Sequence, residues 1–311
     1  MSMQPDLISS LKALPCFDAI TAIDCLAGGL SQTAFKVSTL SQVYFVKKLN
    51  TETANTELSC THICANSSEL EPSVGQLSPD VHYFDSDWLV TSFIHGDTLA
   101  YSKLADSDKT ASALRLMVDL HQLPLPKSNQ AIYPLNTNRS YNRLLIAPAN
   151  FLTQHRVSLD KTCNELTAMI NSLSNSSTNS NVLCHGDINF TNILVDNDNK
   201  AWLLDFECAH IAPAEFDLAM FIAVNSIPTE KVADIIAMYH DLAANSVLDK
   251  QLVNCYLLYS YLINGLWYFD NINSLDSSCP MIDLGESQWS AFDRFAEQEG
   301  ITITDLTTLI A

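Results

Sequence analysis

The sequence predicts an α+β protein in which strands come before residue 95 and helices dominate after it. Residues 20–46, 81–84 and 88–94 alternate apolar and polar side chains around short turns, as strands and hairpins do. Residues 104–123 instead place apolar side chains three or four positions apart and stop before Pro124, which is typical of an amphipathic helix. A second long helical pattern covers residues 252–269.

Composition and charge limit the classes of partner. The 311 residues are 47% hydrophobic and 16% charged, as in ordinary globular proteins. The formal net charge of −19 argues against nucleic-acid binding, because a phosphate backbone requires a basic surface. The same charge fits a cationic small-molecule substrate, and equally an acidity that serves only solubility.

Cysteine usage and apolar segments indicate the compartment. The nine cysteines are odd in number and scattered, which predicts a reduced, cytoplasmic protein. Residues 1–10 lack the basic and apolar regions of a secretory signal. Residues 252–269 carry no charge and reach the length of a membrane span, but they include two asparagines, a serine and six aromatic residues. We interpret this segment as a buried helix beside a ligand site and expect no membrane partner.

The most informative motif lies at residues 185–207. His185-Gly186-Asp187 is followed by Asn192, five positions after Asp187, and by Asp205-Phe206-Glu207, which begins thirteen positions after Asn192. In protein kinases an aspartate at the first position accepts the proton of the attacking hydroxyl, and the later Asn and Asp hold magnesium. A single carboxylate cannot both hold a metal and receive a proton, so the two aspartates divide the work.

The variant H-G-D-x-x-x-x-N followed by D-F-E resembles the aminoglycoside phosphotransferase and choline kinase superfamily, which phosphorylates small molecules. The resemblance implies a bilobal, protein-kinase-like fold with a small β-sheet lobe at residues 1–94 and a larger, mainly helical catalytic and substrate lobe at 95–311. It implies ATP and Mg²⁺ as cofactors, Asp187 as the catalytic residue, and Asn192 and Asp205 as metal ligands. Taken singly, each piece of the motif also fits a structural turn or hairpin.

A glycine pair near the start of the chain fits a phosphate-binding loop. Gly28-Gly29-Leu30-Ser31 lies between two strand patterns, where a turn without side chains lets backbone amides approach phosphate oxygens. The same pair is common in ordinary hairpin turns. Because the superfamily carries a similar loop over its nucleotide, Gly28, Gly29 and Ser31 are predicted to bind the cofactor.

The resemblance also places a lysine–glutamate pair. Val43-Tyr44-Phe45-Val46-Lys47 matches the kinase strand that carries the phosphate-binding lysine, and adjacent strand residues face opposite ways, so Lys48 competes with Lys47. We choose Lys47. The helical stretch that follows offers Glu57 as its partner, with Glu52 as a weaker competitor.

The remaining predicted contacts follow the same alignment of motifs. Ser92, Phe93 and Ile94 occupy the connection through which superfamily members bind adenine by backbone groups. His121 resembles a structural histidine of these enzymes. Asp217 matches an aspartate that braces the catalytic loop, although it also fits a charge at a helix N-terminus.

The substrate pocket is predicted from aromatic residues. Trp and Tyr faces attract quaternary ammonium groups, and choline kinases line their substrate pocket with aromatics in the comparable region. The predicted substrate contacts are Glu207, Tyr261, Trp267, Tyr268 and Trp289. Aromatics at helical spacing also fit a simple core.

These observations predict an ATP- and Mg²⁺-dependent kinase that phosphorylates a hydroxyl of a small, cationic molecule such as choline, ethanolamine or thiamine. An aminoglycoside kinase, which needs a broad acidic cleft, is one alternative. A non-catalytic nucleotide-binding regulator is another, but Asp187, Asn192 and Asp205 are all present. A protein kinase is disfavoured, because no A-P-E follows Asp205.

Overall fold

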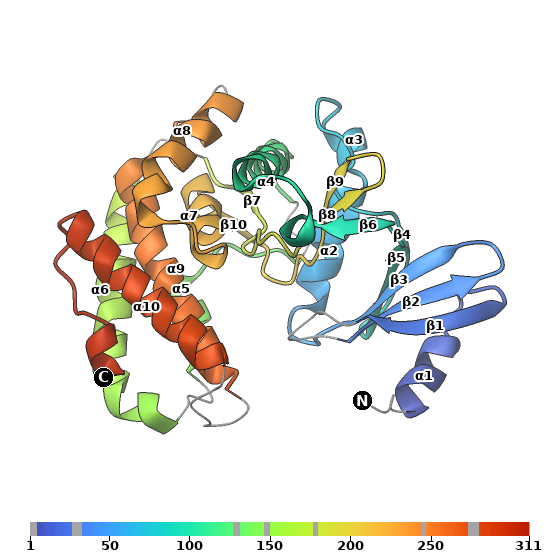
Figure 1. Ribbon diagram of the computed structural model, residues 1–311, viewed down its shortest axis with the longest axis horizontal. Coiled ribbons are helices and arrows are strands. Elements are labelled where there is room, and N and C mark those ends of the chain that lie inside the picture. Colours follow the sequence, from blue (N-terminus) through green and yellow to red (C-terminus); the bar gives the residue numbers. More distant parts are fainter. Residues whose placement is uncertain are drawn as a thin grey trace. The chain divides into compact units, whose positions relative to one another are not determined.

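The computed structural model describes residues 5–26, 33–126, 131–145, 150–176, 180–243, 247–272 and 280–310. The chain forms two compact units (Figure 1). Unit 1 comprises residues 1–105, 126–132 and 191–209, and unit 2 comprises residues 106–125, 133–190 and 210–311. The predicted division at residues 94 and 95 stays a prediction.

Unit 1 is built on a five-stranded antiparallel sheet with the strand order β1-β2-β3-β5-β4. The strands are β1 (Ile20–Leu26), β2 (Ala34–Thr39), β3 (Val43–Lys48), β4 (Val81–Phe84) and β5 (Trp88–Ser92). One face carries alternate apolar side chains, including Phe35, Val37 and Val46, and packs with Leu11 from helix α1 (Pro5–Lys12). Their alternation follows from the two-residue period of a strand and fixes the register of the sheet.

Two further parts complete unit 1. Helices α2 (Ala54–Ala65) and α3 (Ser67–Leu70) follow the third strand. A three-stranded antiparallel sheet joins β6 (Gly96–Thr98), β8 (Ile193–Asp196) and β9 (Ala201–Leu203). A short 3-10 helix (Leu99–Tyr101) comes directly after β6. The β8–β9 hairpin turns at Asn199, whose φ of 63° is a left-handed value that asparagine tolerates.

Unit 2 is mainly helical. Its helices are α4 (Asp106–His121), α5 (Thr137–Leu144), α6 (Arg156–Ser176), α7 (Ala214–Val224), α8 (Val232–Leu242), α9 (Lys250–Asp270) and α10 (Pro280–Gln298). Short 3-10 helices span Asn150–His155, Thr229–Lys231 and Thr307–Leu309. Strands β7 (Val182–Cys184) and β10 (His210–Ala212) pair antiparallel; β7 directly precedes the H-G-D motif, and β10 directly precedes helix α7.

Helix α9 is the centre of unit 2 and packs on α6, α7 and α10. At its contact with α10, a Cβ on Gly265 would lie 2.3 Å from Nε1 of Trp289. A Cβ on Gly285 would lie 2.6 Å from the ring of Phe269. The two glycines therefore let the helices approach closely enough to bury both rings.

The predicted fold class is confirmed: a small antiparallel sheet unit is joined to a larger helical one. The uncharged segment 252–269 forms a largely buried helix, α9, as expected. In the described part of the chain, no helix combines the length and apolarity that a membrane crossing requires. Eight described cysteines have free thiols, and the ninth, Cys279, lies outside the described residues.

Candidate active site

Unit 1 brings three of the predicted residues into direct contact. Lys47, from the end of β3, forms an ion pair with Glu57 of α2 and donates to Oδ1 of Asp205 at 2.8 Å. Lys47 and Glu57 are only 5% and 1% exposed. The neighbouring Lys48 instead pairs at the surface with Asp87 and lies over the Trp88 ring. The alternation of strand residues thus separates a buried lysine from an exposed one.

This cluster carries more negative than positive charge. Oxygens of Glu57, Asp205 and Glu207 all lie within 4.8 Å of one another, and the ammonium of Lys47 pairs with the first two. Burial raises the pKa of Glu57 to about 7, Lys47 opposes the rise, and the carboxylates of Asp205 and Glu207 add to it. Burial alone would lower the pKa of Lys47, but Asp205 and Glu57 raise it above its ordinary value. The lysine therefore stays charged.

The two predicted metal ligands lie at the open end of the β8–β9 hairpin. Asn192 directly precedes β8, and its backbone oxygen accepts a hydrogen bond of 2.9 Å from the amide of Leu204. Asp205 follows with φ 66°, a left-handed conformation that is unusual for a residue with a side chain. Its carboxylate reaches Lys47 from this conformation. The hairpin explains the thirteen-residue spacing, because it returns the chain to its starting edge.

Unit 2 holds the H-G-D loop by backbone contacts with one buried carboxylate. Asp217, in the first turn of α7, accepts the amides of His185 at 3.0 Å and Gly186 at 2.8 Å. Gly186 has φ 76°, where a side chain would be strained, which explains glycine in place of the arginine of protein kinases. Asp187 comes next and is partly exposed.

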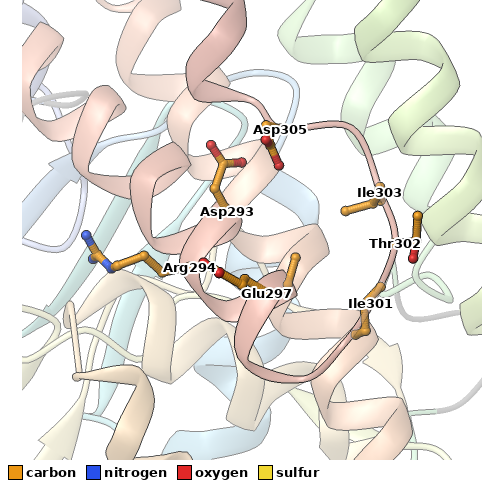
Figure 2. Close-up of a pocket in the computed structure, with 8 residues that line it drawn as sticks. Asp293, Arg294, Glu297, Ile301, Thr302, Ile303 and Asp305 are labelled. Carbon is orange, nitrogen blue, oxygen red and sulfur yellow. The ribbon is translucent and has the colours of Figure 1, made fainter.

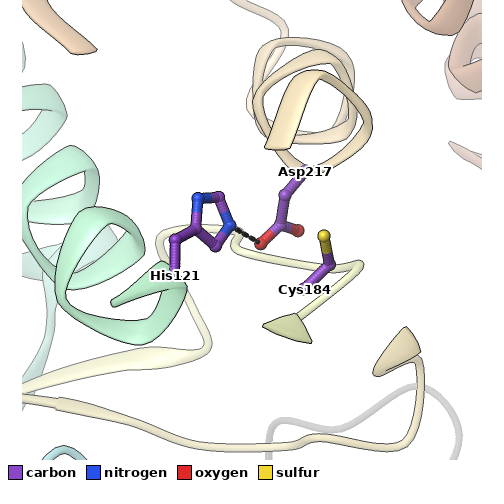
Figure 3. Close-up of side chains that lie close together, drawn as sticks. All are labelled: His121, Cys184 and Asp217. Carbon is purple, nitrogen blue, oxygen red and sulfur yellow. Dashed lines mark hydrogen bonds and ion pairs between the residues drawn. The ribbon is translucent and has the colours of Figure 1, made fainter. Parts of the chain in front are cut away.

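The carboxylate of Asp217 is also bonded by a side chain, at the oxygen that accepts the His185 amide (Figure 3). His121 Nε2 lies 3.0 Å from Oδ2 of Asp217, and His121 Nδ1 lies 2.8 Å from the Tyr239 hydroxyl. Burial alone would raise the pKa of Asp217, but the hydrogen bond and charge of His121, with His185 and the Gly186 amide, hold it below its usual value. Cys184 is adjacent, and burial raises the pKa of its thiol well above the ordinary value. His121 and Asp217 therefore form a bonded brace beside a protonated thiol, which donates to the backbone oxygens of Ala212 and Pro213, and this arrangement does not fit a metal site.

Sequence reasoning missed two asparagines at this loop. Asn189 Nδ2 lies 3.1 and 3.2 Å from the two carboxylate oxygens of Asp187. Asn225, which caps α7, bonds the backbone of Ile188 and Phe190. Asn225 has no sequence signal, because it binds backbone groups 35 or more positions away. Asn189 lies inside the motif, two residues after Asp187, and this proximity was the only available clue.

The predicted aromatic contacts fall into two groups. Tyr261 and Trp289 are 1% and 0% exposed, and Nε1 of Trp289 is bonded to the Leu262 oxygen, so both pack in the core. Trp267 and Tyr268 are partly exposed, with ring centroids 5.3 Å apart. Burial raises the pKa of Tyr268, and the charge of Asp187 raises it further. For Tyr261 and Trp289 the structure favours core packing, whereas Tyr268 lies in the field of Asp187.

The structure describes only some of the residues that are predicted to bind the nucleotide. The amides of Ser92 and Phe93 donate to the backbone oxygens of Asp80 and Val43, so they are already used. Among the described residues, the Ile94 amide has no such partner. Gly28, Gly29 and Ser31 lie outside the described residues.

A pocket of about 400 Å³ lies at the C-terminal end of α10 (Figure 2). Asp293 lines it and accepts bonds from the amides of Leu306 and Thr307. A second pocket, of about 730 Å³, lies between α6 and the first turns of α9. Neither pocket includes a residue of the predicted site. The bonds of Asp293 to Leu306 and Thr307 hold the C-terminal segment against α10.

Comparison with known proteins decides the family. A family model described as the phosphotransferase enzyme family matches residues 24–249, which is more than half of the chain. The chain belongs to the phosphotransferase enzyme family. The match spans Lys47, the H-G-D loop and Asp205, which confirms the resemblance read from these motifs. A search of curated proteins found no relative that matches the sequence.

Solved structures of similar phosphotransferases share the fold. A microcompartment-associated aminopropanol kinase has a TM-score of 0.71 at 13% identity, with 96% of this chain and 100% of that chain covered. A choline kinase from Cryptosporidium parvum Iowa II has a TM-score of 0.66 at 16% identity, with 99% and 100% covered. Spectinomycin phosphotransferase in complex with ADP and spectinomycin has a TM-score of 0.59 at 18% identity, with 98% of both chains covered. At these identities the likeness shows a shared fold.

Proposed function

We propose that this phosphotransferase transfers the γ-phosphoryl group of ATP, with Mg²⁺, to a hydroxyl of a small cationic amino alcohol. The observation that carries the proposal is the arrangement of Lys47, Glu57 and Asp205. A lysine held by a buried glutamate and a hairpin aspartate is the recurring phosphate-binding and metal-binding construction of kinase-like enzymes. Nucleotide-bound structures among those of the same fold agree with nucleotide use.

The charge of the cluster fits magnesium. Three carboxylates around one ammonium leave two negative charges in formal terms, which a divalent cation balances. Carboxylate and amide oxygens are also the ligands that Mg²⁺ prefers, so Asp205 and Asn192 would hold it, with Glu207 close by. When bound, Mg²⁺ would neutralise charge on the phosphate oxygens.

The protein's own groups divide the remaining work. Lys47 binds phosphate oxygens, kept in place by Glu57. The Ile94 amide is a candidate donor to the adenine ring. Asp187 orients the acceptor hydroxyl and receives its proton as the phosphoryl group moves, because a carboxylate at this position is the proton acceptor in kinase-like enzymes. The Asp187 carboxylate has the partly exposed Tyr268 in its field.

The substrate class rests on three observations. The net charge of −19 attracts cations. Trp267 and Tyr268 offer partly exposed aromatic surface for a cationic group, and Tyr268 lies near Asp187. Kinases of amino alcohols, one for aminopropanol and one for choline, share the fold.

The test is magnesium-dependent ADP release with choline, ethanolamine, aminopropanol, thiamine, homoserine, sugars and spectinomycin as acceptors. Turnover on an amino alcohol, lost in Asp187→Asn with ATP binding intact, supports the proposal. Turnover on spectinomycin alone favours an aminoglycoside-type kinase. If Asp187→Asn retains full turnover, the proposed role of Asp187 is wrong. ATP binding with no turnover on any compound favours a nucleotide-binding regulator.

A further inference from the structure

The carboxylate of Asp187 is held by a neighbour in its own loop. Asn189 Nδ2 lies 3.1 Å from Oδ1 and 3.2 Å from Oδ2 of Asp187, so one amide group faces both oxygens almost equally. The backbone also turns here, because the backbone amide of Asn189 donates to the backbone oxygen of Asp187 at 2.8 Å. A hydrogen bond to an ionised acceptor is stronger than a neutral one and fixes its orientation. A carboxylate oxygen can accept more than one hydrogen bond, so this contact does not prevent it from receiving a proton.

Asn189 is itself fixed from both sides by a single residue. Asn225 Oδ1 accepts the amide of Phe190 at 2.9 Å, and Asn225 Nδ2 donates to the backbone oxygen of Ile188 at 2.9 Å. These two groups flank Asn189. The same Nδ2 also donates to the Phe221 oxygen in α7, which fixes the Asn225 side chain to its own helix.

Helix α7 therefore holds the catalytic loop on both sides of Asp187. Asp217 in its first turn binds the amides of His185 and Gly186, and Asn225 at its end binds the loop at residues 188 and 190. Contacts to the backbone do not restrict a side-chain torsion, so the orientation of Asp187 also depends on a contact to its carboxylate. Asn189 supplies that contact.

We propose that Asn189 is a positioning residue for Asp187, and that Asn225 keeps Asn189 in place. The inference rests on the proposed function, in which Asp187 receives the proton of the acceptor hydroxyl. Its physical basis is the sensitivity of a reacting geometry: a misplacement of about 1 Å costs on the order of 100-fold in rate. Loss of Asn189 is therefore expected to lower kcat while nucleotide binding stays unchanged.

The decisive variant is Asn189→Asp, which keeps the size and shape of the side chain but removes its donor. If Asn189 only fills space, kcat should survive this change. If Asn189 positions Asp187, kcat should fall, because a charged acceptor then faces the Asp187 carboxylate in place of a donor. We expect kcat to fall by about 10- to 100-fold in Asn189→Ala and at least as far in Asn189→Asp. The KM for ATP is expected to stay within about twofold. Asn197→Asp, at an exposed hairpin turn, makes the same charge change and is expected to leave kcat unaltered.

The second variant tests the support. In Asn225→Ala we expect kcat to fall and the amide of Phe190, which donates to Asn225 Oδ1, to exchange faster with solvent. Where Asn225→Ala does not fold, the two Asn189 variants decide the question alone. Where no acceptor is turned over, slow ATP hydrolysis serves as the assay.

The outcomes distinguish a failure of the positioning role of Asn189 from a failure of the proposed function. If Asn189→Asp keeps kcat within about threefold of the native value while Asp187→Asn is inactive, the positioning role is overturned and the proposed function stands. If Asp187→Asn keeps its activity, both the proposed role of Asp187 and the inference fail. Equal losses in Asn189→Asp and Asn197→Asp would indicate a general charge effect and also overturn the inference.

Discussion

The lysine cluster of unit 1 and the H-G-D loop of unit 2 hold their key carboxylates in different ways. Two carboxylates share the ammonium of Lys47, a third from Glu207 lies close to them, and the pKa of Glu57 is raised to about 7. Around Asp217, backbone amides and His121 bind one carboxylate, and its pKa is lowered. The Lys47 cluster has an excess of negative charge that a bound cation can balance. The second is satisfied by the protein itself.

This difference indicates how the two groups respond to ligands. A buried charge that is fully bonded gives rigidity, whereas a partly balanced cluster changes its energy when a cation binds. We therefore expect the loop to be preorganised without ligand. We expect the stability of the Lys47 cluster to depend on pH and magnesium. Four experiments test this contrast, from the largest expected effect to the smallest.

Removing the carboxylate of the loop brace should have the largest effect. Asp217→Ala leaves His121 and the amides of His185 and Gly186 without their acceptor in a site where Asp217 is 0% exposed. Breaking such a buried pair costs about 3–5 kcal/mol of unfolding free energy. Denaturant unfolding measures the loss, and Asp217→Asn, which keeps an acceptor oxygen, should lose less. A loss below about 1 kcal/mol for Asp217→Ala would contradict the brace.

Removing the lysine should have a smaller effect that depends on pH. In Lys47→Met, Glu57 remains 1% exposed beside two other carboxylates. At pH 6 Glu57 can take up a proton and become neutral. At pH 8 it must either stay charged in a buried site or bind a proton at a cost in free energy. The loss of unfolding free energy should therefore reach about 1–3 kcal/mol only at the higher pH. The double variant Lys47→Met/Glu57→Gln should remove most of this pH dependence. Equal destabilisation at both pH values would show that charge is not the cause.

Magnesium should stabilise the native protein by a smaller amount. The raised pKa of Glu57 means that the folded state binds a proton more tightly than the unfolded state. This stability is fully present below the ordinary value of 4.5 and is lost as pH rises through about 7. A cation should restore part of it, by about 1.4 kcal/mol at ten times its Kd, and more at pH 8 than at pH 6. Thermal unfolding with MgCl₂ measures the gain, and Asp205→Asn should reduce it.

The aromatic neighbour of Asp187 should give the smallest effect. Tyr268 is partly exposed, so Tyr268→Phe should change unfolding free energy by less than about 0.5 kcal/mol. Its position in the field of Asp187 predicts a change of a few-fold in the KM for the acceptor, without a change in the KM for ATP. Tyr261→Phe is the matched control, because Tyr261 is 1% exposed. Similar acceptor KM values in both variants and the native protein would remove Tyr268 from the substrate pocket.

Local motifs predicted the fold class and the main charged residues, for physical reasons. Strand alternation separates Lys47 from Lys48, and a hairpin with a polar turn places Asn192 beside Leu204 and Asp205. Such relations depend on short spacing in the chain. The burial of Trp289 and Tyr261 depends instead on how α9 and α10 pack at Gly265 and Gly285. Helical spacing alone cannot distinguish a core aromatic from a pocket aromatic.

The residues that hold the H-G-D loop could not be predicted from short sequence patterns either. Asn225 binds the backbone of Ile188 and Phe190, and backbone groups carry no mark in a sequence. Asp217 could be predicted as a brace only through family resemblance. Its bonds to His121 and to the H-G-D loop join segments 96 and about 30 positions apart.

Helix α7 also acts as a spacer of defined length. Asp217 and Asn225 are eight residues apart, which corresponds to about 12 Å along a helix. One residue inserted between them would turn the second anchor by about 100° and move it by about 1.5 Å. Surface substitutions on neighbouring helices should therefore be tolerated far better than any change in the number of residues in α7. In variants of this chain, we expect the position of the H-G-D loop to depend more on the length of this helix than on its composition.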